Sequence, residues 1–295
     1  MLILESIKKE YSHLLPKDED ILFYKKHGWY TSPVMLDDMV IKEALDGTQE
    51  FYRGEIDKEV LHQRIASSVD NQEGTLFNDE FVTLQKESLA NAGFHPLVVA
   101  TAAILAETDE IRLFADSLLT KKPSSDRSIN TVGWHSDKAY WPTCTSNNML
   151  TAWIPLQDCT LDMGPLFHID ESHRWRTDDQ VKKYFNFTNM DLSGFQEYLQ
   201  SDRPEAKEVP MLLKKGQVSF HNCHTIHASR SNLSSRDRIA LAIHFQDATN
   251  KYQQVFKPNG DLIRIGYDYL CREDAAGNPD YRDPSIFPTL LKSNK

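Results

Sequence analysis

Three residues near the middle of the chain, His135-Ser136-Asp137, have the types and spacing of a metal-binding pair. Side chains alternate between the two faces of a β-strand, so residues two apart point the same way. An imidazole and a carboxylate would then converge on one point. A second imidazole from another strand would complete a 2-His-1-carboxylate face, which leaves coordination positions open for substrate and oxygen. With 11 histidines in the chain an H-x-D triplet also arises by chance, as His168-Ile169-Asp170 shows, and the alternative interpretation is a surface pair.

The third ligand would have to come from the C-terminal strands, where several histidines compete. His227 is favoured because Ser229 shares its face if the strand continues. The run 232–235, Asn-Leu-Ser-Ser, is then typical of a turn, and a new strand begins near Arg238. The competing candidates are His221, His224, His227 and His244.

The segment 238–247, RIALAIHFQD, predicts a strand with two different faces. Small residues around a single arginine indicate a pocket floor with one fixed cation, and Arg238 is suited to bidentate capture of a carboxylate. Two alternatives remain open: Arg238 pairs with a neighbouring acid, or Arg236, of the same parity, takes its role, although the turn favours exposure of Arg236. The pocket face would carry Arg238, Ala240, Ala242, His244 and Gln246, and the core face Ile239, Leu241, Ile243 and Phe245.

The elements around these residues predict a single domain, 1–295, with a helical flank over about 1–106 and a β-rich core over 107–250. Short strands broken by Pro, Gly, Ser and Asn favour a sandwich or barrel in the core. Helical spacing returns over about 176–207, where Thr177 with Gln180 and Ser193 with Gln196 fit capping boxes, and this insertion could act as a lid. The tail 251–295 is expected to be irregular.

Composition narrows the class of protein. A formal net charge of −10 argues against nucleic acid as a partner, because phosphate binding needs a basic surface. No apolar run approaches the roughly 18–20 residues of a membrane span, and the charged start MLILESIKKEY does not fit a signal peptide, so a cytoplasmic protein is expected. The four cysteines are far apart and are expected to be reduced.

Taken together, the motifs resemble the phytanoyl-CoA dioxygenase family of Fe(II)/2-oxoglutarate oxygenases. The resemblance covers roughly 20–250 and rests on the order of several short stretches. One departure is Asp170-Glu171, where the family usually has Pro-Gly before its Ser-His element. The matching stretches are FYKKHGWY, KKP at 121–123, WHSD at 134–137, AWIPLQD at 152–158, GP at 164–165, SHR at 172–174 and HASRSNLSSRDR at 227–238.

The resemblance implies an all-β core of the double-stranded β-helix (jelly-roll, cupin-like) type, with flanking and largely N-terminal helices. It makes His135, Asp137 and His227 the ligands of Fe(II) and Arg238 the anchor of 2-oxoglutarate, with Ser229 beside it and Trp153 in the same pocket. His168 would be incidental, His173 structural, and His221 and His224 core or supporting residues.

The implied reaction consumes O₂ and 2-oxoglutarate, releases succinate and CO₂, and abstracts a hydrogen from a small organic substrate. Because related halogenases lack the carboxylate, Asp137 predicts hydroxylation or a related outcome. Lys138, Tyr140 and Trp141 could line the substrate entrance. The alternatives are a non-redox, metal-dependent hydrolase or isomerase of the cupin type, an acyl-CoA hydroxylase within the family, or a binding module without activity. The oligomeric state cannot be predicted from these patterns.

Overall fold

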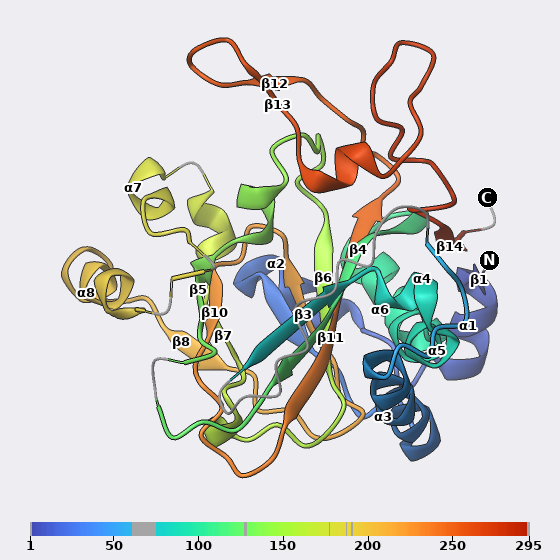
Figure 1. Ribbon diagram of the computed structural model, residues 1–295, viewed down its shortest axis with the longest axis horizontal. Coiled ribbons are helices and arrows are strands. Elements are labelled where there is room, and N and C mark those ends of the chain that lie inside the picture. The colour runs from blue at the N-terminus through green and yellow to red at the C-terminus, as the bar shows by residue number, and fades with distance from the viewer. Residues whose placement is uncertain are drawn as a thin grey trace.

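The computed structural model describes residues 2–60, 75–126, 129–176, 178–186, 188–189 and 191–293. Within them, two β-sheets pack together into a jelly roll (Figure 1). The larger sheet has the order β1-β14-β4-β11-β6-β9-β2, with β3 paired to β4, and the smaller sheet has the order β5-β10-β7-β8. The expected double-stranded β-helix core with flanking helices is therefore confirmed.

The larger sheet is built around two long antiparallel strands that carry most of the sheet's pairing. These are β4 (Glu110–Lys121) and β11 (Arg238–Asp247). Its other strands are β1 (Leu2–Ile3), β2 (Trp29–Thr31), β3 (Leu76–Glu80), β6 (Leu150–Pro155), β9 (Ser219–Asn222) and β14 (Thr289–Lys292). The smaller sheet contains β5 (Val132–His135), β7 (Leu166–Ile169), β8 (Glu208–Pro210) and β10 (His227–Ser229), and β12 (Val255–Phe256) pairs with β13 (Leu262–Ile263).

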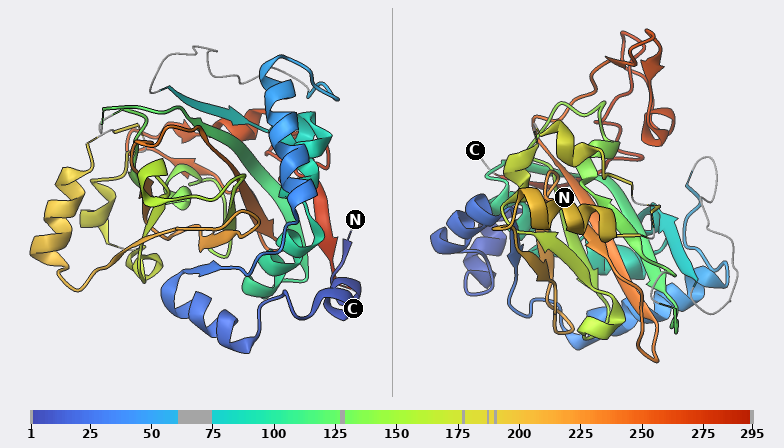
Figure 2. Two further views of the ribbon diagram at one scale, coloured as in Figure 1. Left: turned by 90° about the horizontal axis from the view of Figure 1, so that it is seen from below. Right: turned by 90° about the vertical axis from the view of Figure 1, so that its left-hand side faces the viewer.

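Helices from the N-terminal third cover the outer face of the larger sheet (Figure 2). The local sequence explains two of their boundaries: Asp37 caps α3 by accepting from two backbone N–H groups, and Gly28 ends α2 in the left-handed conformation. The helices are α1 (Leu4–Tyr11), α2 (Asp18–His27), α3 (Asp38–Tyr52), α4 (Val82–Gln85), α5 (Glu87–Gly93) and α6 (Pro96–Leu105), with α7 (Asp179–Lys182) and α8 (Ser193–Asp202) in the later insertion. Short 3₁₀ turns are η1 (Asp137–Tyr140), η2 (Leu161–Met163), η3 (Ser172–Trp175) and η4 (Gly266–Tyr269).

Both ends of the chain contribute more to the sheet than their sequence texture suggested. From the stretch expected to be helical, β2 pairs with β9 and β3 pairs with β4. From the tail expected to be irregular, β14 pairs with β4 and with β1, which brings the two termini close together (Figure 1). Strands this short carry too little alternation to be distinguished from turns by pattern.

The core face of β11 is as the sequence predicted, but of the five residues expected on its pocket face three line the cavity, and Gln246 instead donates to the carbonyl oxygens of Leu113 and Tyr281. Ile239, Leu241, Ile243 and Phe245 belong to the main hydrophobic cluster, together with side chains of α3, α5 and α6. Arg238, Ala242 and His244 line a cavity between the two sheets. The alternation along one strand therefore places apolar core on one side and the polar cavity on the other.

The insertion that carries α7 and α8 packs against β5 through close backbone contact. Gly133 allows this, because a Cβ there would lie 2.0 Å from the carbonyl oxygen of Asn186. The capping box expected at Ser193 is wrong: α8 has no side-chain cap, and the carboxylate of Asp191 instead accepts from the Ser193 backbone N–H. Asp178 caps α7, while Thr177 lies outside the described residues.

Residues 87–105 have the length and hydropathy of a membrane span, which the sequence analysis did not anticipate. In the structure this stretch is two helices, α5 and α6, and most of it is buried inside the protein. Its apolar character is thus that of core helices in this fold. The four cysteines are all free, as expected, and only Cys271 is partly exposed.

Candidate active site

His135, Asp137 and His227 converge on one point inside the cavity. β5 ends at His135, η1 begins at Asp137, and β10 begins at His227, which is the cross-strand partner of His135. Their candidate ligand atoms all lie within 4.8 Å of one another. The Oδ1 atom of Asp137 is 3.5 Å from Nε2 of His227 and 4.0 Å from Nε2 of His135.

Backbone carbonyls fix the orientation of both imidazoles. The Nδ1 atom of His135 lies 2.7 Å from the carbonyl oxygen of Gly133, and that of His227 lies 2.9 Å from the carbonyl oxygen of Thr225. Because a carbonyl can only accept, each Nδ1 carries the proton and each Nε2 presents its lone pair. Burial lowers the pKa of both histidines, which favours the neutral, metal-binding form.

The second carboxylate oxygen of Asp137 is held from behind. Thr151 on β6 donates to Oδ2 at 2.5 Å, and the Thr151 hydroxyl lies 2.7 Å from Nδ1 of His244 on β11. A hydroxyl that donates to Asp137 must accept from His244, so the order is His244 to Thr151 to Asp137. His221 Nε2 lies 3.3 Å from the same oxygen. This arrangement leaves Oδ1 as the oxygen available to a metal.

The surroundings keep Asp137 ionised. Burial alone would raise its pKa, but the imidazoles of His227, His221 and His244 outweigh that cost, and the pKa lies well below the ordinary value. One anion and two neutral imidazoles on one side of a cavity form the donor set that iron(II) takes in the 2-His-1-carboxylate class. The residues present therefore fit such an ion.

Arg238 lies in the same cavity with no acid to neutralise it. Its side chain is 1% exposed, and its Nε and Nη1 atoms have no hydrogen-bond partner among the described residues. Its guanidinium stacks over the ring of Trp153 at 5.8 Å, and the indole Nε1 of Trp153 is also without a partner. Burial lowers the pKa of Arg238 only to about 10, so it stays charged at neutral pH. Unpaired buried donors of this kind fit a carboxylate ligand.

Lys121, the cross-strand partner of Arg238, is a residue that the site prediction missed. Its fully buried Nζ atom donates to the Ser229 hydroxyl at 2.7 Å and to the carbonyl oxygens of Ser229 and Arg230. Burial and then the charge of Arg238 lower the pKa of Lys121 well below its usual range. With its oxygen engaged by Lys121, the Ser229 hydroxyl is free to donate its own proton into the cavity.

The cavity has a volume of about 670 Å³, and its far side is built from parts of the chain outside the predicted site. Asn78 and Glu80 come from β3, and Ile265 and Tyr267 come from the C-terminal segment. The Tyr267 hydroxyl donates to Glu80 at 2.9 Å. Burial raises the pKa of Glu80, which the bond from Tyr267 opposes. The expected irregular tail thus supplies one wall of the cavity.

The other candidate residues are divided between the cavity and its surroundings. Trp141 is in the cavity wall, with its ring centroid 5.0 Å from that of His244, and Tyr140 also lines the cavity. Lys138 lines a separate groove, and its Nζ donates to the carbonyl oxygen of Ser146 at 2.8 Å. His224 lies in that groove as well and contacts Asn147.

The second H-x-D motif does not form a metal site with the first. His168 is fully buried on β7, whereas Asp170 accepts from His27 and from the indole of Trp29, which ties β7 to the end of α2 and to β2. His173 packs against Gly28, where a Cβ would lie 2.3 Å from its Nδ1, and contacts the carbonyl oxygen of Lys25.

A jelly roll with this His-Asp-His cluster and a buried arginine belongs to the class of folds that house mononuclear iron sites. The family model for phytanoyl-CoA dioxygenase (PhyH) matches residues 34–240, and the chain belongs to this family. A curated relative, the peroxisomal phytanoyl-CoA dioxygenase of Bos taurus, is 27% identical over 161 residues, 52% of this chain and 47% of the relative. The match therefore spans about half the length of that relative.

Solved structures show the same fold. The 2-oxoglutarate-dependent carbocyclase SnoK from nogalamycin biosynthesis superposes with a TM-score of 0.68 at 20% identity, over 93% of this chain and 96% of that one. The epimerase SnoN, solved with Fe³⁺, 2-oxoglutarate (α-ketoglutarate) and nogalamycin RO, superposes with a TM-score of 0.65 at 20% identity, over 92% and 98%. Similarity at this level of identity establishes the shared architecture.

Proposed function

We propose that this protein is an Fe(II)/2-oxoglutarate-dependent dioxygenase that oxidises a small organic molecule by hydrogen abstraction. The observation that carries the proposal is the placement, in one cavity, of three converging metal-ligand atoms and a buried guanidinium that no carboxylate of the described residues neutralises. The first set suits the metal and the second suits the distal carboxylate of 2-oxoglutarate. Membership of the PhyH family supports the same assignment.

The residues have distinct tasks in this proposal. Nε2 of His135, Nε2 of His227 and Oδ1 of Asp137 would hold iron, while Thr151 and His221 keep the other oxygen of Asp137 engaged. Iron bound there supplies the oxygen chemistry, with decarboxylation of 2-oxoglutarate to succinate and CO₂. The protein orients the partners and excludes water.

The opposite end of the cavity would receive 2-oxoglutarate. Arg238 donates to the distal carboxylate, Ser229 donates from the side, and Trp153 closes the floor with its unpaired indole N–H nearby. Lys121 does not need to touch the ligand: it holds Ser229, and an anion bound beside Arg238 would offset the burial that lowers the pKa of Lys121 and so favour its charged form. A dianion would compensate both cations, which explains why the chain tolerates two buried basic groups side by side.

The direct test is succinate release from 2-oxoglutarate by protein reconstituted with Fe(II). We expect slow release without substrate, and its loss in His135→Ala with folding retained by circular dichroism. His13→Ala is the matched control, since that histidine is exposed and remote from the cavity. Equal release by His135→Ala and wild type would refute the proposal. Succinate release also excludes a non-redox hydrolase or isomerase, which would leave 2-oxoglutarate unchanged.

Asp137 also bears on the outcome of the reaction. Because its carboxylate occupies a ligand position, chloride has no place on the metal, and we propose hydroxylation or another hydrogen-abstraction product. Aerobic turnover in the presence of chloride should yield products without chlorine by mass spectrometry. A chlorinated product would contradict this assignment.

A further inference from the structure

A second hollow of about 510 Å³ lies on the other side of the strand end that carries the metal ligands. Ser136 and Lys138 line it, and these residues flank Asp137 in the chain, while His135 and Asp137 themselves face the main cavity. Tyr140 lines both hollows. The segment 135–140 therefore borders both the groove and the cavity, which share the side chain of Tyr140.

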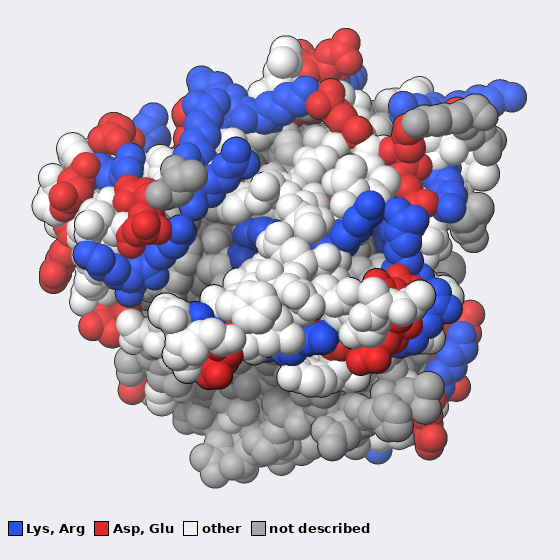
Figure 3. Space-filling view, turned by 90° about the horizontal axis from the view of Figure 1, so that it is seen from above, with Lys and Arg blue, Asp and Glu red and all other residues white. Residues whose placement is uncertain are grey.

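The groove is basic in a protein that is acidic overall. Lys138, Arg176 and Lys182 line it, and no Asp or Glu is among its described lining residues. The chain as a whole has a net charge of −10. Lys and Arg side chains gather around a hollow on the α7 side of the face in Figure 3. By contrast, the hollow beside β7 and η2 is lined by Asp126, Asp162 and Asp191.

The charges in the groove are only partly compensated from within the protein. Among the described residues, the Arg176 side chain forms no hydrogen bond or ion pair, and Lys138 contacts only the carbonyl oxygens of Cys144 and Ser146. Lys182 contacts Asp179, which is 86% exposed on the outer side of α7. Burial and then the charges of Lys138, Arg176, His173 and Lys182 lower the pKa of His224 to about 4.

We propose that this groove binds an anionic group of the organic substrate, a carboxylate or a phosphate, and so directs the rest of the molecule past Tyr140 to the metal. The inference rests on the proposed function and adds a substrate class to it. Arg176 and Lys182 provide the charge at the mouth, and Trp175 and Phe185 provide apolar walls for the adjoining part of the substrate. The bend from groove to cavity would then place a carbon several bonds from the anion near the metal.

The test uses two anions, inorganic pyrophosphate and citrate, titrated calorimetrically into metal-free protein at low ionic strength, where charge contacts are weakly screened. We expect binding of at least one, and a loss of about tenfold in affinity in the double variant Arg176→Gln/Lys182→Gln. Preference for one probe distinguishes phosphate from carboxylate. The matched control, Arg174→Gln/Lys183→Gln, removes the same charge from the same segment but from residues that do not line the groove.

Equal affinities in the two double variants, or no binding of either anion by the wild type, would overturn the proposal. Metal and 2-oxoglutarate take no part in this titration, so its failure is separate from failure of succinate release. With an anionic substrate in hand, the groove variant should raise KM about tenfold with kcat retained, whereas a merely structural role would lower the melting temperature and leave anion affinity unchanged.

Discussion

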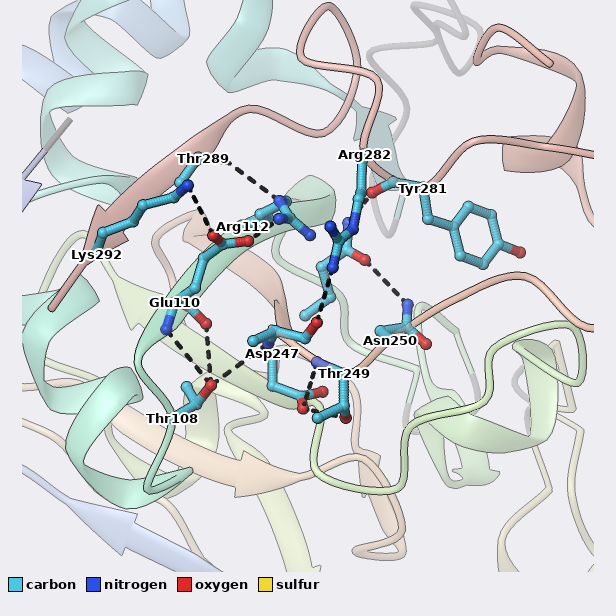
Figure 4. A network of polar contacts seen from close by, with 12 residues as sticks. Thr108, Glu110, Arg112, Asp247, Thr249, Asn250, Tyr281, Arg282, Thr289 and Lys292 are labelled. Carbon is cyan, nitrogen blue, oxygen red and sulfur yellow. Dashed lines mark hydrogen bonds and ion pairs between the residues drawn. The ribbon is translucent and has the colours of Figure 1, made fainter. Parts of the chain in front are cut away.

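Arg112 and Arg238 are both buried, and they lie at opposite ends of the same pair of strands, β4 and β11. Arg112 belongs to a network of charged and polar partners (Figure 4). It forms an ion pair with Glu110 and donates to Thr289, and Lys292 reaches Glu110 at 3.0 Å. Among the described residues, Arg238 lies over the ring of Trp153, and its Nε and Nη1 atoms have no hydrogen-bond partner.

This difference distinguishes an arginine that is paired within the fold from one whose donors are available to a ligand. The Arg112 network joins β14 to β4, so its charges neutralise one another and hold the C-terminal strand in the sheet. The Arg238 end carries two buried basic groups that no described carboxylate neutralises. Burying a charged group without a counter-ion is unfavourable, and proteins retain such groups at sites where a bound ligand neutralises them. This contrast supports the proposed ligand-binding role for the cavity end of the strand pair and a stabilising role for the network end.

Replacing each arginine by methionine gives the largest contrast. In metal-free protein without 2-oxoglutarate, Arg112→Met should lower the free energy of unfolding by about 3 kcal/mol, because Glu110 is left buried without its partner. Arg238→Met should be neutral or stabilising by about 1 kcal/mol, since it removes an uncompensated charge. Urea unfolding measures both. Equal destabilisation would show that the two arginines play the same role.

Acid should destabilise the protein through a buried histidine of the cavity, His244, and a histidine of the adjoining groove, His224. The pKa values of His244 and His224 fall from 6.5 to about 4, with burial as the main cause. The unfolded chain therefore takes up protons first, and stability should fall as the pH drops from about 6.5 to 4, by up to about 1.4 kcal/mol per pH unit for each histidine. His244→Gln should reduce the slope of stability against pH. An unchanged slope would contradict the assignment to His244.

Thr151→Val tests whether the hydrogen bond from Thr151 positions Asp137, the proposed metal ligand. The substitution keeps the shape but removes the bond that holds Oδ2 of Asp137, so the affinity for Fe(II) should fall about 10–100-fold. Thr143→Val is the control: its hydroxyl bonds Tyr281 near the C-terminal segment. Both variants lose a buried hydrogen bond, and only the first should change metal affinity. A parallel loss in the control would point to a general effect on stability.

Ser229→Ala should have the smallest effect. Loss of one hydrogen bond to the distal carboxylate should raise the 2-oxoglutarate concentration at half-saturation about five- to tenfold. The nearby Ser231→Ala should leave that value unchanged, because Ser231 is not among the residues that line the cavity and its hydroxyl donates to the carbonyl oxygen of Ile129. Steady-state succinate release measures both. If Ser231→Ala has the larger effect, the assignment of Ser229 is wrong.

Where the position of a residue follows from alternation along one strand, the sequence was sufficient to predict it. The two faces of β11 and the shared face of His227 and Ser229 follow from spacing, and motif order led to the jelly roll and to the His-Asp-His set. Where a role depends on contact between distant strands, no local signal existed. The register of β4 on β11 places Lys121 opposite Arg238, and the register of β6 on β11 places Thr151 opposite His244. From these positions Lys121 contacts Ser229 on β10, and Thr151 contacts Asp137 in η1.

The ends of the chain were the weakest part of the prediction for a related reason. β2, β3 and β14 gain their stability from partners far away in sequence rather than from their own residues. Tyr267 enters the cavity wall from a segment whose polar composition resembles a surface loop. At Ser193 the local pattern suggested a cap, but Asp191 was closer to the same N–H group.

The central claim is that one cavity binds a metal through His135, Asp137 and His227 and a diacid through Arg238. Anaerobic titration with Fe(II) and 2-oxoglutarate, followed by the weak visible charge-transfer band of the chelated metal, tests both halves at once. The account predicts a band that needs both components in wild type, and at least about 100-fold more 2-oxoglutarate to form it in Arg238→Met. A wild type without the band, or an Arg238→Met titration that overlays the wild type, would contradict it.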